Sequence, residues 1–180
     1  MSKGNSLVVA ALDFGTTYSS WAFSFKHEYE MEPTKVTAKQ WYGFESAVSL
    51  KAPTSILIKP DGETFHSFGF EAETDYASLA EENQHKDYFY FQRFKMQLYD
   101  KMTLGQTFKI QDIAGKSLSA NVVFSLSIKY LKDDLLETIR SRLLDKTILE
   151  SDIHWVLTVP AIWNDVAKQF MRSAAENVCC

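Results

Sequence analysis

Two strand-like segments joined by a very short turn constrain this chain more than any other feature of its sequence. Residues 7–12 form an almost continuous apolar run, which is typical of a strand buried on both faces. Residues 19–25 alternate instead, placing Trp21, Phe23 and Phe25 on one face, as in a half-buried strand. Because so few residues separate the two segments, the strands must pair antiparallel as a hairpin.

The rest of the chain predicts further strands and helices around this hairpin. We expect strands over residues 53–58, 63–68 and 153–159, and helices over residues 70–79, 120–146 and 166–178. The helix over 120–146 has the clearest pattern, because one apolar stripe recurs every three or four residues: Phe124, Ile128, Leu131, Leu135, Ile139 and Leu143. Its start can be capped by Ser117 or Ser119, and that of the last helix by Asn164 or Asp165.

Three segments lack a regular pattern. Residues 26–53 read as an irregular insertion, in which 27–33 is expected to be an exposed loop. Residues 1–6 are expected to be a flexible N-terminus, and residues 176–180 an atypical or truncated end. The end carries Cys179 and Cys180, for which truncation is a better explanation than a prenylation site, since no GTPase motif accompanies them.

Composition excludes several classes of function. With 46% hydrophobic residues among 180, the chain can bury a core, so wholesale disorder is excluded. A net charge of −4 without any basic block argues against nucleic-acid binding. No apolar run is long enough to span a membrane. Two cysteines are too few for a disulfide scaffold, so we expect a reducing, cytoplasmic location.

The turn after the first strand is the strongest candidate for a functional site. Asp13 ends the strand, Gly15 can adopt a positive φ, and Thr16 and Thr17 add hydroxyl groups. Backbone N–H groups in such a turn can point at phosphate oxygens, and Asp13 can hold Mg²⁺ through its water ligands. The alternative is an ordinary β-turn with local hydrogen bonds. No P-loop pattern occurs, and the D-F-G at 13–15 lacks the other kinase motifs.

The turn also carries a resemblance to a known family. Residues 13–19 (D-F-G-T-T-Y-S) resemble the first phosphate motif of the 70-kilodalton heat-shock chaperones and their actin-like relatives. Residues 158–165 (T-V-P-A-I-W-N-D) resemble the V-P-A-x-[FW]-N-D segment of the same family, in the same order along the chain. Trp163, where most members carry Phe, and residues 90–98 (Y-F-Q-R-F-K-M-Q-L) are similar to the divergent branch called heat shock 70 kDa protein 12.

The resemblance implies a fold and a set of roles. The fold would be α/β, a ribonuclease-H-like lobe of an actin-like ATPase, with a mixed five-stranded sheet and flanking helices. The nucleotide ligand would be ATP or ADP with Mg²⁺, and the partners protein clients or co-chaperones. The implied site residues are Asp13 for Mg²⁺ and the attacking water, Gly15, Thr16, Thr17 and Tyr18 for the phosphates, Lys95 as catalytic lysine, and Pro160 as switch.

Two of these roles have alternatives in the sequence itself. Lys86 and Arg93 lie close to Lys95 in the chain, and Lys95 could also be a surface lysine on an amphipathic helix. Pro160 could simply end a strand.

The resemblance covers a single lobe, from about residue 7 to residue 175. The family's catalytic glutamate segment, second phosphate loop, adenosine loop and peptide-binding domain have no counterpart in the sequence. We therefore expect ATP hydrolysis of a two-lobed parent but weak nucleotide binding and negligible turnover of this chain alone. The alternatives are a non-catalytic interaction module or a fragment of a longer protein of the same branch.

Overall fold

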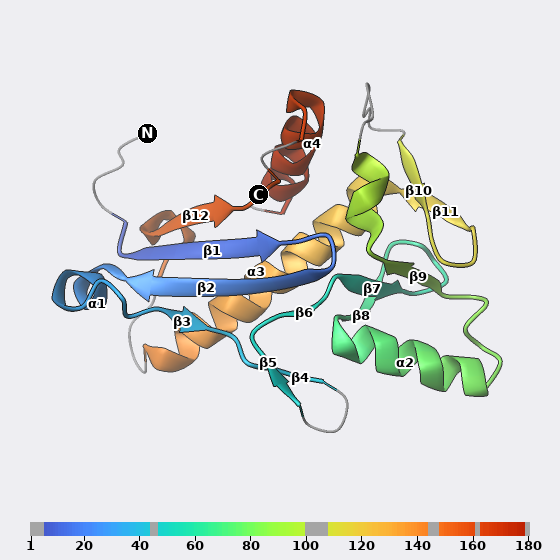
Figure 1. The fold of residues 1–180 in the computed structure, drawn as a ribbon, viewed down its shortest axis with the longest axis horizontal. Coiled ribbons are helices and arrows are strands. Elements are labelled where there is room, and N and C mark those ends of the chain that lie inside the picture. The colour runs from blue at the N-terminus through green and yellow to red at the C-terminus, as the bar shows by residue number, and fades with distance from the viewer. Residues whose placement is uncertain (1–5, 44–46, 100–107, 144–147, 161–162, 179–180) are drawn as a thin grey trace.

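The structure is a computed structural model that describes residues 6–43, 47–99, 108–143, 148–160 and 163–178 (Figure 1). Four features of the sequence therefore lie wholly or partly outside the described residues. They are the flexible N-terminus up to residue 5, the end of the predicted long helix beyond residue 143, residues 161–162 of the second motif, and the two cysteines.

A mixed five-stranded sheet contains the predicted hairpin. Strands β1 (Val8–Phe14) and β2 (Tyr18–Phe25) pair antiparallel, with Phe14 opposite Ser19 at the turn. The prediction that the first strand is buried on both faces is wrong, because burial alternates along β1 and Val9, on its outer face, is 48% exposed. Strand β12 (Ile153–Leu157) lies parallel to β1 on its other side, and β3 (Thr37–Ala38) and β6 (Ala52–Pro53) both pair with β2. The parallel β1–β12 pair makes the sheet mixed, so the predicted α/β class and mixed five-stranded sheet are confirmed.

The long helix α3 (Ala120–Arg142) lies across one face of this hairpin (Figure 1). The predicted apolar stripe explains the packing, because its members from Phe124 to Ile139 are buried in the same core as the inward side chains of β1. Phe124 is central, with ring centroids 5.8 Å from Phe14, 5.0 Å from Phe94 and 5.4 Å from Phe170. One expectation is wrong: Ser119 is at the N-cap position, but its side chain makes no capping hydrogen bond.

A second sheet of three strands lies beside the first, in the order β8 (Phe65–Phe68), β7 (Ser55–Ile58) and β9 (Phe89–Gln92). Helix α2 (Phe70–Glu81) packs against β7 and β8. Alternate residues of β7 face opposite ways: Ile56 and Ile58 join the main core, and Leu57 joins a small cluster with Ala72 and Tyr90. This strand is therefore buried on both faces.

The predicted strand over 53–58 is divided in two by Thr54, which separates β6 from β7. The physical reason is that the backbone N–H of Thr54 donates to the Thr17 carbonyl in the hairpin turn, at 2.9 Å, and not to a neighbouring strand. The two halves consequently belong to different sheets, so residues 52–58 connect them.

The region read as an irregular insertion contains short elements. Residues 27–33 are exposed as expected, apart from the partly buried Glu28, but the loop prediction is wrong for most of them, because α1 (Lys26–Met31) is a helix. No proline or glycine interrupts the chain there until Pro33, so the backbone N–H of Glu32 can bond to the carbonyl of Glu28. The strands β4 (Trp41–Tyr42) and β5 (Val48–Ser49) form a small hairpin further along.

The remaining elements complete the described fold. They are the 3₁₀ helices η2 (Phe94–Leu98) and η3 (Glu150–Asp152), the hairpin of β10 (Lys109–Gln111) and β11 (Ser117–Ser119), and the helix α4 (Asp165–Glu176). The predicted cap of α4 is confirmed, because Asn164 Oδ1 accepts the backbone N–H of Ala167 at 2.9 Å. Among the described helices, none is both long enough and apolar enough to cross a bilayer.

Phe124→Ala tests the central position of this side chain. Because Phe124 is fully buried against three other phenylalanine rings, we expect the free energy of unfolding to fall by about 3–5 kcal/mol. Urea denaturation followed by circular dichroism measures the change. Tyr29→Ala, at a side chain that is 56% exposed, should change stability little. A loss below about 1 kcal/mol at Phe124 would contradict the packing described.

Candidate functional site

The β1–β2 turn is closed tightly at Gly15. A β-carbon at this position would lie 2.1 Å from the carbonyl oxygen of Tyr18, far inside van der Waals contact. The φ angle of Gly15 is not in the positive range, so the expected reason for this glycine is wrong. The turn requires glycine because the backbone of Tyr18 approaches it closely.

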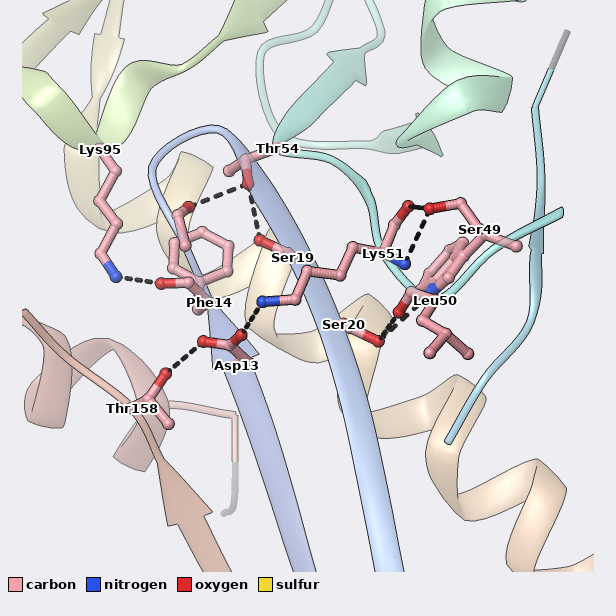
Figure 2. A network of polar contacts seen from close by, with 12 residues as sticks. Asp13, Phe14, Ser19, Ser20, Ser49, Leu50, Lys51, Thr54, Lys95 and Thr158 are labelled. Carbon is pink, nitrogen blue, oxygen red and sulfur yellow. Dashed lines mark hydrogen bonds and ion pairs between the residues drawn. The ribbon is translucent and has the colours of Figure 1, made fainter. Parts of the chain in front are cut away.

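Thr54 holds this turn from the side (Figure 2). Its hydroxyl donates to the Gly15 carbonyl at 2.9 Å and lies 2.7 Å from the Ser19 hydroxyl. Its backbone N–H bonds to the Thr17 carbonyl. The N–H groups of Thr16 and Thr17 donate to no other described residue, so they are available to an anion.

Asp13 lies at the end of β1 with a donor on each carboxylate oxygen (Figure 2). The Thr158 hydroxyl donates to Oδ1 at 2.8 Å, and the Lys51 ammonium lies 2.6 Å from Oδ2. Burial acts to raise the pKa of Asp13. The hydrogen bonds from Lys51 and Thr158 and the positive charges of Lys51 and Lys95 outweigh that effect, so the pKa of Asp13 is lowered below its usual 3.8. The carboxylate is therefore ionised at neutral pH.

Lys95 reaches the other side of the turn from η2. Its side chain is 1% exposed, and its ammonium group donates to the carbonyl oxygen of Phe14. The same group lies 5.2 Å from the centroid of the Phe14 ring and 4.9 Å from that of Trp163. Burial lowers the pKa of Lys95 to about 8, although the nearby charge of Asp13 acts to raise it. The reading of Lys95 as a surface lysine is wrong.

The two alternatives to Lys95 are both exposed. Arg93 has a left-handed backbone, with φ 49°, and lines a depression of about 300 Å³ beside Thr17 and Tyr18. Lys86 makes one contact through its carbonyl, which accepts from Lys116. Of the three cations, Lys95 alone extends to the Asp13–Phe14 end of β1.

Pro160 follows β12 between two residues that contact the site. Thr158 bonds to Asp13, and the Trp163 ring lies beside the Lys95 ammonium. The backbone N–H of Trp163 donates to the Pro160 carbonyl at 3.2 Å. Pro160 therefore lies between a residue that contacts Asp13 and one that lies beside Lys95.

The structure thus brings together most residues predicted from the sequence: Asp13, Gly15, Thr16, Thr17, Tyr18 and Lys95. Sequence reasoning missed Lys51, because it falls in the irregular region and no motif or periodicity marks it. Thr54 lies in the predicted strand over residues 53–58 and Thr158 in the second motif, but their position beside the turn depends on the pairing of distant strands.

A divalent cation does not fit the described arrangement at Asp13. Mg²⁺ in nucleotide sites keeps most of its waters and is bound through one or two carboxylates together with phosphate oxygens, so its binding here depends on whether the Asp13 carboxylate is free. The Lys51 ammonium lies on one of its oxygens, and Thr158 bonds to the other. Among the described residues, no group of three or more His, Cys, Asp or Glu side chains could hold a metal ion.

The fold and site define an α/β protein with a candidate anion-binding turn at the end of a parallel strand pair. No model of a known protein family matches the chain. The chain is 38% identical over 170 residues to human heat shock 70 kDa protein 12B and 39% identical to human heat shock 70 kDa protein 12A. It is 38% identical to mouse heat shock 70 kDa protein 12A.

These matches cover 93–94% of this chain but 24% of each relative, so the chain spans about a quarter of their length. The predicted relationship to the heat shock 70 kDa protein 12 branch is confirmed over the matched residues.

Gly15→Ala tests the closure of the turn. The added methyl group would meet backbone and not a movable side chain, so we expect a loss of roughly 1–3 kcal/mol in the free energy of unfolding. Gly43→Ala is the matched control, because its β-carbon would meet only the side chain of Phe70, at 3.2 Å. Equal stability losses in the two variants would contradict the tight approach of Tyr18.

The buried ammonium of Lys95 predicts a specific pH dependence. Its pKa is about 8 in the folded state and near 10.5 in the unfolded state, so between these values the unfolded chain binds more protons. Stability should therefore rise with pH, by about 2 kcal/mol between pH 7 and pH 10 from this group. Lys95→Met should remove this rise in urea denaturation, whereas Lys129→Met, at an exposed lysine, should retain it. Parallel pH profiles for wild type and Lys95→Met would refute the assignment.

Proposed function

We propose that this chain is a ribonuclease-H-like first lobe of an actin-like nucleotide-binding domain, and that it binds the phosphates of ATP or ADP at the β1–β2 turn. The observation that carries this proposal is that four side chains from separate parts of the chain meet at the same turn. Side chains from four separate segments, Asp13, Lys51, Lys95 and Thr158, meet at one glycine turn with free backbone N–H groups. The similarity to heat shock 70 kDa proteins 12A and 12B supports it.

Each residue of the turn has a physical role in this proposal. The N–H groups of Thr16 and Thr17 and the hydroxyl groups beside them would donate to phosphate oxygens. Lys95 would supply a positive charge where negative charge accumulates during phosphoryl transfer. Its burial strengthens this effect, because the surrounding protein screens the charge less than water does. Pro160 would couple the site to movement of the segment between Thr158 and Trp163.

Asp13 would not contact phosphate directly. As a carboxylate it would repel phosphate, unless a cation stands between the two. Lys51 already occupies that position on Oδ2. A metal ion carried in by the nucleotide would supply further charge neutralisation, and it would have to displace Lys51 from Asp13.

The lobe alone should bind nucleotide weakly. Tyr18 is 50% exposed and the Asp13 side chain is 44% exposed, so bound phosphates would remain in contact with water on one side. Electrostatic attraction is much weaker in water than in an enclosed site. Since the chain spans a quarter of its relatives' length, ATP hydrolysis, chaperone activity, client or co-chaperone binding and a cytoplasmic location are proposals for a longer protein.

Titration with ATP and MgCl₂, followed by ¹⁵N–¹H NMR of the 180-residue chain, tests the proposed function. We expect shifts of the Gly15, Thr16 and Thr17 amides with a dissociation constant in about the millimolar range, and no hydrolysis. Lys95→Met should weaken binding about tenfold or more, because one charge-assisted contact is lost. Arg93→Ala, at the exposed neighbouring cation, is the matched control.

Two results would count against the proposal. Unshifted amides at the turn up to saturating ATP would reject nucleotide binding. A loss of binding in Arg93→Ala, with Lys95→Met unaffected, would show that the wrong cation was assigned. Micromolar affinity with Mg²⁺-dependent hydrolysis would contradict the weakness expected of the isolated lobe.

A further inference from the structure

Lys51 is a cation at the site that lies outside both sequence motifs. It precedes β6, the short strand that pairs with β2 next to the turn, with Ala52 opposite Ser19. Its ammonium group lies 2.6 Å from Asp13 Oδ2, and 52% of its side chain is exposed. The ion pair is therefore at the open side of the site, where a ligand would arrive.

The backbone around Lys51 positions this side chain. The Ser49 hydroxyl donates to the Lys51 carbonyl at 2.7 Å and accepts from the Lys51 N–H at 3.1 Å. The Ser20 hydroxyl, on β2, donates to the Leu50 carbonyl at 2.6 Å. These bonds attach the residues before β6 to the strand that carries the turn, so Lys51 is held beside Asp13 from a well-supported backbone.

The two lysines approach the end of β1 from opposite sides (Figure 2). Lys95 comes from η2 and bonds to the Phe14 carbonyl, and Lys51 comes from the segment before β6 and bonds to Asp13. Two ammonium groups and one carboxylate leave an excess of positive charge at the turn. That charge is what a group of phosphate oxygens requires, and it is supplied entirely by side chains.

A divalent cation at Asp13 would compete with Lys51. Both are attracted to the carboxylate of Asp13, and two cations in adjacent positions repel each other. The Lys51 ammonium already lies 2.6 Å from Asp13 Oδ2, within reach of a charge-assisted hydrogen bond. A metal ion would therefore gain less at this carboxylate than it would at one without a lysine partner.

We propose that Lys51 takes the electrostatic place of the divalent cation, so that this lobe binds a nucleoside polyphosphate through Lys51 and Lys95 without requiring Mg²⁺. The inference rests on the proposed nucleotide binding and refines it, because it states which charge neutralises the phosphates. In the bound state the Lys51 ammonium bridges Asp13 and a phosphate oxygen. Asp13 then acts as a positioning residue for the lysine.

The test compares ATP titrations of the 180-residue chain in EDTA and in MgCl₂, read from the NMR shifts of the Thr16 and Thr17 amides. We expect the wild-type affinities in the two buffers to agree within about threefold. Lys51→Met should lose about tenfold or more in EDTA, because a charge-assisted contact to phosphate is removed. It should recover part of that loss in MgCl₂, since the carboxylate of Asp13 becomes free for the metal ion.

Two further variants separate the role of this charge from folding and from general electrostatics. Lys51→Arg keeps the positive charge and should bind ATP in EDTA nearly as wild type does. Lys35→Met removes a lysine of matched exposure, 51%, that is ion-paired with Glu28 at 2.9 Å away from the turn, and it should leave binding unchanged. Dispersed NMR spectra of each variant establish that it is folded.

The outcomes distinguish this inference from the proposed function. If wild type binds ATP in MgCl₂ but at least about tenfold more weakly in EDTA, nucleotide binding stands and the role of Lys51 is rejected. The same conclusion follows if Lys51→Met and Lys35→Met bind alike in EDTA. If wild type binds ATP in neither buffer, the proposed function fails and this inference fails with it.

Discussion

The hydrogen bonds from Thr54 to the β1–β2 turn are the interaction on which the arrangement of the two sheets depends. They fix the point where the chain leaves the five-stranded sheet and enters the three-stranded one. They also bind the carbonyl groups of Gly15 and Thr17, whereas the N–H groups of Thr16 and Thr17 donate to no other described residue. One threonine therefore contributes both to the architecture and to the shape of the candidate site.

The electrostatics of the site follow from unequal burial of its charges. Lys95 is enclosed between aromatic rings, where desolvation disfavours its charged form, whereas Lys51 and Asp13 remain about half exposed. The buried cation is enclosed by protein, whereas the exposed pair is open to solvent. Such a division suits an anion that enters from solvent and meets a fixed charge at the inner end of its site.

Local sequence patterns predicted the elements that have strong periodicity or distinctive end residues. The hairpin, the α3 stripe and the Asn164 cap are confirmed because each depends on residues close together in the chain. The helix α1 was missed because its side chains have no buried face and so no apolar period. The role of Gly15 was misjudged because its neighbour in space, the Tyr18 carbonyl, is invisible in local propensity.

The sequence by itself determined the motif at 13–19, the motif at 158–165 and the relationship to the heat shock 70 kDa protein 12 branch, since all three reside in the order of residues. Only the tertiary structure decided that Lys51 forms an ion pair with Asp13, that Lys95 is buried, and that the Thr158 hydroxyl donates to the other carboxylate oxygen of Asp13. The physical reason is that these contacts join strands and loops distant in the chain. Their distances are set by sheet pairing and core packing, which no local pattern encodes.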